Sequence, residues 1–181
     1  MRVQVSTGFD KCNLKITSRD IILVPHLFVD MPDIYNKILN EIHESVKNED
    51  KLWKSWHGDS HFIADDKAEN WKDKSKTFTA VINRIRDYFG MDIKATRLNW
   101  FKDQSEWKPF HHDAAAVKPD KAKTQNFTVG ISFGCEREIS FEENHSGRKV
   151  SFPLPDGMTY CFTKDINIHW KHGVPQVPPE K

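Results

Sequence analysis

From residue 93 onward the chain alternates between short segments rich in β-branched and aromatic residues and turn-forming pairs such as Ser146-Gly147. These segments are expected to be strands, at residues 93–101, 126–133, 138–142, 149–154, 158–163 and 166–172. Strands this short, joined by tight turns, favour a sandwich or jelly roll over a sheet with crossover helices. The C-terminal half is therefore predicted to be mainly β.

Two amphipathic helices are predicted before this β region. The first is expected to begin at an Asp30 N-cap and to end near Lys47. The second is expected over residues 77–89, with Gly90 as a left-handed C-cap. Both carry apolar residues at helical spacing along one face. An apolar strand over residues 20–29 should precede them, so the fold class is α+β and mainly β, with two supporting N-terminal helices.

The composition sets broad limits on the class of protein. At 181 residues, a single domain over residues 1–181 is the default expectation. Lys and Arg number 27 against 26 Asp and Glu, a balance that neither demands nor excludes nucleic acid. The three cysteines are scattered without a CxxC pair, which favours a reducing compartment. With no signal-like N-terminus and no apolar run of about 18 residues, we expect no membrane contact and a cytoplasmic or nuclear location.

Residues 48–76 differ from their surroundings because they are charged, lack periodicity and contain Trp53, Trp56 and Trp71. One interpretation is a surface excursion whose aromatic side chains attach it to the body of the protein. The other is a substrate lid, in which tryptophans stack on bases and the neighbouring lysines meet phosphates. On the second interpretation, Trp53 and Trp56 are candidate substrate-binding residues.

Candidate metal ligands lie at two places in the β region. Residues two apart on an extended strand point to the same side, so His111 and Asp113 can face one ion while His112 faces away. A third ligand would come from His169 or His172, which are three apart and would face opposite sides of a strand. His172 is favoured because it precedes a Gly-Val-Pro sequence, where a strand would end at an opening.

Two imidazoles and one carboxylate form a facial triad that leaves three positions open on an octahedral metal. This ligand set suits non-haem Fe(II) that handles O2. A zinc hydrolase with the same three ligands and a bound water is the alternative on ligand chemistry alone. The sequence contains no nucleophile elbow, no phosphate-binding loop and no dinucleotide-binding glycine motif.

Five segments carry a family resemblance through their order and spacing: residues 98–101, 107–113, 131–141, 154–160 and 169–175. In this order the chain resembles the AlkB-like 2-oxoglutarate/Fe(II)-dependent dioxygenases, over roughly residues 80–175. The resemblance implies a double-stranded β-helix, or jelly roll, with the two preceding helices against one sheet. It also implies Fe(II) as the metal, with 2-oxoglutarate and O2 as cosubstrates.

The resemblance assigns roles by position. His111, Asp113 and His172 match the iron ligands, and Asn99 matches an Asn that contacts 2-oxoglutarate. Phe101 stands where the family often has a Tyr with the same function, so a hydroxyl contact is missing.

Two positively charged positions of the family bear on substrate and cosubstrate binding: that of Arg137 and that of an Arg after the distal His. Arg137 matches an Arg of some nucleic-acid demethylases, with a strand-edge salt bridge as the alternative role. The family anchors the cosubstrate carboxylate with an Arg on a strand after the distal His, and Lys181 comes before such a strand. Either the final strand is missing after residue 181, or another basic residue substitutes, or 2-oxoglutarate binds weakly.

The implied reaction decarboxylates 2-oxoglutarate to succinate and hydroxylates a C–H bond; an N-methyl group would then leave as formaldehyde. The implied substrate is an N-alkylated base in DNA or RNA, flipped out or single-stranded. A protein or small-molecule hydroxylase on the same scaffold and a catalytically silent binding module are the alternatives. The sequence does not indicate an oligomeric state.

Overall fold

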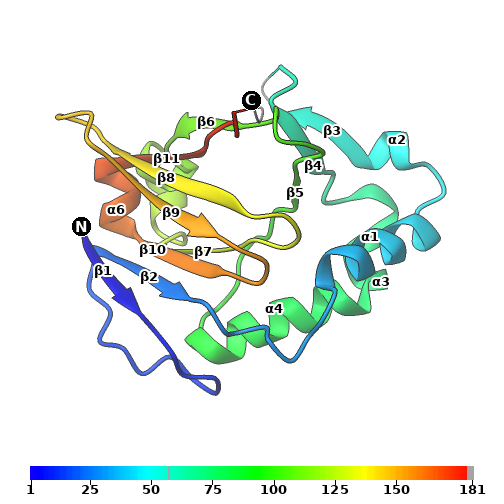
Figure 1. The fold of residues 1–181 in the computed structure, drawn as a ribbon, viewed down its shortest axis with the longest axis horizontal. Helices are drawn as coiled ribbons and strands as arrows, with labels where there is room; N and C mark the ends of the chain where they lie inside the picture. Colours follow the sequence, from blue (N-terminus) through cyan, green and yellow to red (C-terminus); the bar gives the residue numbers. More distant parts are fainter. Residues whose placement is uncertain (57, 179–181) are drawn as a thin grey trace. The chain divides into compact units, whose positions relative to one another are not determined.

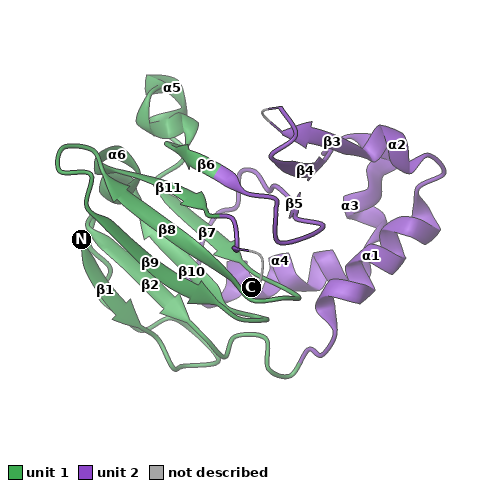
Figure 2. Ribbon diagram, turned by 45° about the horizontal axis from the view of Figure 1, so that its top comes forward, with its two compact units in different colours: residues 1–30, 109–175 green, residues 31–108, 176–181 purple. Residues whose placement is uncertain are grey.

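The computed structural model describes residues 1–56 and 58–178, which divide into two compact units (Figure 2). The first unit comprises Met1–Asp30 and Pro109–Pro175, and the second comprises Met31–Lys108 and the C-terminal residues from Gln176. Residues 57 and 179–181 lie outside the described part. No helix among the described residues has both the length and the apolar character needed to cross a bilayer.

Two four-stranded sheets make up most of the first unit (Figure 1). Their strands are β1 (Arg2–Val5), β2 (Asp20–Val24), β6 (Lys108–His111), β7 (Phe127–Ile131), β8 (Arg137–Glu143), β9 (Lys149–Leu154), β10 (Thr159–Thr163) and β11 (Trp170–Val174). One sheet has the order β1-β2-β10-β7, and the other has the order β6-β11-β8-β9. Three short helices lie between strands: η2 (Ala114–Ala116), α5 (Pro119–Ala122) and α6 (Lys164–His169).

The two sheets share one apolar core. Ile21 and Phe162 come from the first sheet, and Ile139 and Phe141 from the second, and all four are at most 2% exposed. The rings of Phe141 and Phe162 meet edge to face with centroids 5.7 Å apart. Burying a large apolar side chain stabilises the fold by about 1.5–3 kcal/mol, so this core holds the sheets together as a sandwich.

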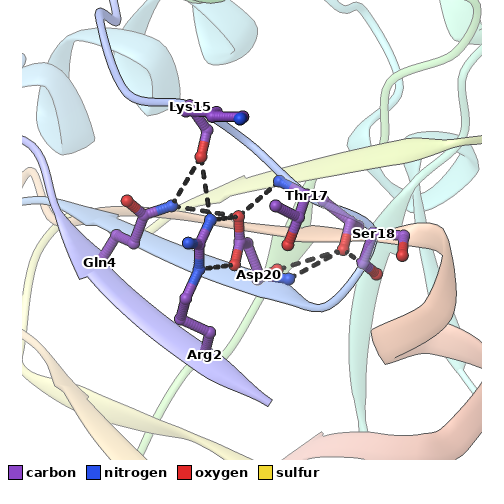
Figure 3. Close-up of polar contacts among 7 residues, drawn as sticks. Arg2, Gln4, Lys15, Thr17, Ser18 and Asp20 are labelled. Atoms are coloured by element: carbon purple, nitrogen blue, oxygen red, sulfur yellow. Dashed lines mark hydrogen bonds and ion pairs between the residues drawn. The ribbon is translucent and has the colours of Figure 1, made fainter.

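A buried carboxylate fixes the N-terminal strand (Figure 3). Asp20, at the start of β2, is fully buried, and Arg2 in β1 donates to it from Nε and Nη2 over 2.6 and 2.7 Å. Gln4 and the backbone N–H of Thr17 also donate to this carboxylate. The hydrogen bonds from Arg2 outweigh the effect of burial and lower the pKa of Asp20 to about 2. The side chain is therefore an anion that links β1 to β2.

The second unit consists of helices and a small sheet. Its helices are α1 (Ile34–Ser45), α2 (Glu49–Leu52), η1 (Ala68–Asn70), α3 (Trp71–Lys74) and α4 (Lys76–Phe89), and its strands β3 (Trp53–Trp56), β4 (His61–Ala64) and β5 (Asn99–Trp100) form an antiparallel sheet in that order. Glu41 of α1 accepts hydrogen bonds from the Ser75 hydroxyl and from Thr77 at the start of α4. These bonds tie the two long helices together.

The two long helices and the strand over residues 20–29 are confirmed, with shifts at their ends. The strand ends at Val24, before Pro25, and Gly90 caps α4 in the left-handed conformation with φ 58°. The N-cap at Asp30 is wrong: α1 begins after Asp33, whose left-handed conformation with φ 61° ends the preceding turns.

Residues 48–76 contain regular elements although their sequence shows no periodicity. The segment contains α2, β3, β4 and α3, and Trp71 is fully buried. Periodicity was undetectable because each element is only about four residues long, too short to show a helical or strand repeat.

Two predicted strands are shorter than expected. In residues 93–101 only Asn99 and Trp100 form a strand, because β4 offers partners only at Phe62 and Ile63. Residues 166–172 are helical up to His169 and become a strand at Trp170. The alternation of Ile and polar residues here resembles a strand, but both Ile166 and its neighbour Asn167 are buried, as one turn of helix allows.

Candidate metal centre

His111, Asp113 and His172 converge within the first unit. His111 ends β6, Asp113 follows in extended conformation, and His172 lies in β11, the neighbour of β6 in the sheet. Nε2 of His111 and Nε2 of His172 lie 3.6 and 3.5 Å from Oδ1 of Asp113. The candidate ligand atoms of the three side chains all lie within 4.8 Å of one another. Ligand atoms about 2.1 Å from a metal and at right angles are about 3 Å apart, so a cation needs only small side-chain movements.

The orientation of the His111 ring follows from its second nitrogen. Nδ1 lies 2.8 Å from the carbonyl oxygen of Pro109, and only a protonated nitrogen can donate to a carbonyl. Nε2 is the nitrogen that faces Asp113. A backbone acceptor on the far nitrogen is the usual way in which a protein orients a metal-binding imidazole.

His172 lies deeper than His111. Its side chain is 8% exposed, against 28% for His111. The rings of Phe162 and Phe141 lie 4.8 and 6.1 Å from its ring, between centroids. Water is thus largely kept from one side of the group by the core of the sandwich.

Asp113 uses its two oxygens differently. Oδ1 faces both imidazoles, whereas Oδ2 accepts from Gln125 Nε2 over 3.2 Å and lies 3.5 Å from the hydroxyl of Thr128. Burial alone would raise the pKa of this carboxyl, but the hydrogen bonds and charges of His111 and His172 together hold the pKa far below its ordinary value. Asp113 is therefore an anion at neutral pH, with one oxygen oriented toward the cation position.

Asn167 of α6 connects the two ligand-bearing segments. Its side-chain oxygen accepts from the backbone N–H of Asp113 over 2.8 Å, and its amide nitrogen donates to the Asp113 carbonyl over 3.4 Å. Its own carbonyl accepts from Nδ1 of His112 over 2.6 Å, so His112 is held away from Asp113, as expected. His169 ends α6 and is not in the converging group.

Asn99 and Phe101 lie in the second unit, where both contact His61. The Asn99 amide oxygen is 3.1 Å from Nε2 of His61, and the Phe101 ring stacks on the His61 ring at 4.8 Å. Trp53 packs against Trp100 with centroids 4.7 Å apart. These residues form one aromatic and polar cluster on the small sheet.

Trp56 lies in the second unit and Arg137 in the first. The guanidinium of Arg97 lies 5.4 Å from the Trp56 ring. Arg137, in β8, donates from Nη2 to the Pro175 carbonyl over 3.0 Å. This bond attaches the segment after β11 to β8.

Sequence reasoning missed Asn167 and the pair Gln125 and Thr128. A polar residue between two isoleucines is a signal for a buried, hydrogen-bonded side chain, and Asn167 is of that kind. Gln125 and Thr128 carry no such signal, because polar residues before a strand are common.

The donor set fits a cation such as Fe(II). Two imidazole nitrogens and one carboxylate oxygen lie close together as in a facial triad. Residues 31–181 match a protein family described as the 2OG-Fe(II) oxygenase superfamily, a range that includes all three residues. No curated protein matches the chain.

Proposed function

Because the chain belongs to the 2OG-Fe(II) oxygenase superfamily, we propose that His111, Asp113 and His172 are the ligands of its iron. The protein is a 2-oxoglutarate-dependent dioxygenase that uses Fe(II), 2-oxoglutarate and O2. The observation that carries the ligand proposal is the position of Asp113 Oδ1 between the two Nε2 atoms, within 3.6 Å of each.

The bound metal and cosubstrate supply the oxidation of a C–H bond, coupled to decarboxylation of 2-oxoglutarate. The residues of the chain orient and protect this chemistry. The Pro109 carbonyl orients the ring of His111, and Gln125 donates a hydrogen bond to Oδ2 of Asp113. Phe162 keeps water from His172. The open side of the triad is left for the cosubstrates.

The fold proposal is a jelly roll. From β6 onward the chain passes repeatedly between the two sheets: β6, β11 and the adjacent pair β8 and β9 lie in one, and β7 and β10 lie in the other. The shared core between the sheets supports this assignment. A jelly roll accounts for the position of His172 beside His111 and Asp113, because β11 is the neighbour of β6 in the sheet.

For the substrate we propose an N-alkylated base of DNA or RNA, as in AlkB-like enzymes. Two features support this: the order of the sequence motifs and the aromatic side chains of the small sheet in the second unit. Trp53, Trp56, Phe62 and Trp100 are all partly exposed there. Partly exposed aromatic rings are the usual stacking platforms for single-stranded bases.

Basic groups accompany these rings. Lys102 Nζ lies 3.7 Å from the centroid of the Phe62 ring, and Arg97 and Lys108 lie 5.4 and 5.9 Å from that of Trp56. Of the lysines in residues 48–76, Lys54 pairs with Asp65. Arg97, Lys102 and Lys108 lie beside the aromatic rings and are further candidates for phosphate contacts.

Lys72 is likewise engaged in an ion pair, with Nζ 2.8 Å from Oδ1 of Asp66.

A protein or small-molecule hydroxylase remains the second candidate function. The formal charge of +1 favours it, because phosphate binding draws on excess positive charge. The family match supports either enzyme over a silent binding module.

The test is substrate-dependent conversion of 2-oxoglutarate to succinate by protein loaded with Fe(II). N-methylated single-stranded oligonucleotides should stimulate succinate formation and release formaldehyde, and Asp113→Ala should do neither. Unmethylated oligonucleotides of the same sequence are the matched control. Stimulation by peptides but not by methylated oligonucleotides would transfer the proposal to the second candidate.

A further inference from the structure

The connection between β6 and β7 forms an exposed basic loop in the first unit, with α5 lying beside β6 (Figure 2). This basic loop comprises residues 114–124 and contains the short helices η2 and α5. It has three lysines, Lys118, Lys121 and Lys123, against one acidic residue, Asp120. All four of these side chains are exposed. The loop therefore presents a net positive charge to solvent.

The positive charges of the basic loop are largely left without acidic partners. Lys123 Nζ lies 3.9 Å from Oδ1 of Asp120, but the two side chains are 77% and 99% exposed, so this pair contributes little. Within the described part of the chain, neither Lys118 nor Lys121 forms an ion pair. At least two ammonium groups are thus available to an anion from solution.

Both ends of the basic loop are attached to the candidate metal centre. The backbone N–H of Asp113, just before the loop, donates to Asn167 over 2.8 Å. Gln125, just after the loop, donates from Nε2 to Oδ2 of the same Asp113 over 3.2 Å. Ala115, near the start of the loop, is only 4% exposed. The loop therefore leaves from one proposed iron ligand and returns to it, within one compact unit.

This attachment limits how far the lysines lie from the metal centre. Lys118 follows Asp113 by five residues, and an extended chain spans at most about 3.6 Å per residue, so their Cα atoms are within about 18 Å. Lys123 precedes Gln125 by two residues, a span of at most about 7 Å. Phosphates of one strand repeat about every 3.4 Å along a DNA helix. The lysines can therefore reach phosphates within about five nucleotides of a base held at the metal.

The chemistry of the loop suits a nucleic-acid strand. Lysine binds phosphate as a point charge, and such contacts hold a strand without reading its sequence. Val117, next to Lys118, is 66% exposed and offers an apolar contact to a sugar or base beside those phosphates. The partly exposed rings of the small sheet favour a ligand with stackable bases over an acidic peptide.

We propose that the basic loop binds phosphates of the single strand that flanks the N-alkylated base. This inference rests on the proposed function and deepens it. It assigns the strand contact to the unit that contains His111, Asp113 and His172, whereas Arg97 and Lys102 belong to the second unit.

The loop variant combines Lys118→Gln, Lys121→Gln and Lys123→Gln in the full chain. All three positions are exposed, so the variant should fold like the wild type. It removes three positive charges and keeps side chains that can form neutral hydrogen bonds.

A matched control variant combines Lys11→Gln, Lys15→Gln and Arg19→Gln. It removes the same charge from exposed positions of the same unit. These residues lie between β1 and β2, and β10 separates β2 from β7 in the sheet. Loss of a general electrostatic attraction would affect both variants, whereas loss of a phosphate contact should affect only the loop variant.

Binding is measured by fluorescence anisotropy at several salt concentrations, with Mn(II)-loaded protein and no O2. The probe is a single-stranded oligodeoxyadenylate of about 11 nucleotides with one central N1-methyladenine. Each phosphate contact to a single strand contributes about 0.7 to the slope of log K against log salt concentration. The loop variant should lose about 2 from this slope and bind about tenfold or more weakly at low salt. The control variant should keep the wild-type slope.

Turnover of two substrate lengths separates the loop from the iron centre. A trinucleotide with the same central base lacks the flanking phosphates, so formaldehyde release from it should have the same kcat/KM in the loop variant and the wild type. With the longer strand, kcat/KM of the loop variant should fall about tenfold. Equal losses for the two lengths would mean that the substitutions disturb the iron centre, and would overturn the proposal.

The remaining outcomes distinguish the loop from the proposed function. If the wild type releases formaldehyde from the methylated strands and the loop variant keeps the wild-type slope, only the role of the loop is overturned. Equal loss of slope in the loop and control variants overturns it as well. If the wild type releases formaldehyde from neither length, the proposed substrate is wrong, and the role of the loop is overturned with it.

Discussion

Oδ1 of Asp113 lies 3.5 Å from Nε2 of His172, although the two residues belong to segments far apart in the sequence. The same oxygen lies 3.6 Å from Nε2 of His111. One carboxylate oxygen thus faces two imidazoles, a crowded arrangement that a cation would relieve by binding all three ligand atoms.

Asp113→Ala and His172→Ala should each reduce decarboxylation of 2-oxoglutarate by more than about a hundredfold, because each removes a proposed metal ligand. Addition of Mn(II) should raise the unfolding temperature of the wild type through mass action and should not change that of either variant. Thermal unfolding with and without the metal measures this difference.

His112→Ala and His169→Ala are the matched controls for those substitutions. His112 bonds to the Asn167 carbonyl, and His169 ends α6, so neither faces the triad. In both variants Mn(II) should still raise the unfolding temperature. If Mn(II) no longer raised the unfolding temperature of His169→Ala but still raised that of His172→Ala, the third ligand would be His169.

Asn167→Ala should weaken metal binding although it leaves all three ligands in place. The substitution removes both side-chain hydrogen bonds to the backbone of Asp113. Loss of a group that orients a ligand reduces metal affinity by about 10–100-fold. Unsatisfied groups should also lower the free energy of unfolding by about 1–3 kcal/mol. Metal titration followed by calorimetry tests this, with Asn144→Ala as the control; Asn144 is an exposed residue after β8 whose side chain bonds to the Ile168 carbonyl of α6. Unchanged affinity would show that the ligand segments are held by other contacts.

Gly130→Ala should destabilise the protein by about 1–3 kcal/mol, because its methyl group must displace the Tyr160 ring. In a Tyr160→Ala background the same substitution should cost less, since the ring is absent. Urea unfolding of the two single variants and the double variant measures the coupling energy, expected at about 0.5–3 kcal/mol. Additive effects would mean that the ring moves away without cost.

Asp20→Asn should reduce the dependence of stability on acid pH. The pKa of Asp20 is about 2 in the folded protein and about 3.9 in an unfolded chain. Its stabilisation is therefore complete above about pH 4 and is lost as the pH falls toward 2. Since Arg2 is half exposed, we expect a contribution on the order of 1–2 kcal/mol. The difference in unfolding free energy between Asp20→Asn and wild type should shrink by that amount between pH 5 and pH 2. Asp10→Asn, at an exposed position, should show no such trend.

Much of this architecture was open to prediction from sequence because strong local patterns coincide with burial. The helix over residues 77–89 shows a clear apolar stripe and ends at a glycine, and the structure has α4 there. The strands at residues 126–133, 138–142, 149–154 and 158–163 correspond to β7, β8, β9 and β10. The spacing of His111 and Asp113 also indicated a shared direction, which their 3.6 Å approach confirms.

Other features depend on contacts that no local pattern contains. The helix before His172 was expected to be a strand, since Ile166 and Ile168 alternate with polar residues. Tertiary bonding decides there, because Asn167 satisfies the backbone of Asp113 only from a helical turn. Similarly, the lone glycine in β7 is explained only by the ring of Tyr160, which is remote in sequence.

Helix α6 leads directly into β11 and carries Asn167, which is bonded to the segment of Asp113. A residue inserted into the six positions of α6 would rotate His172. The same insertion would release Asp113 from its hydrogen bonds with Asn167. The loop of residues 114–124 lies between Asp113 and Gln125 and contains none of the three triad residues. Changes of chain length that preserve activity should therefore be accepted in that loop and rejected between β10 and β11, which a series of single-residue insertions would map directly.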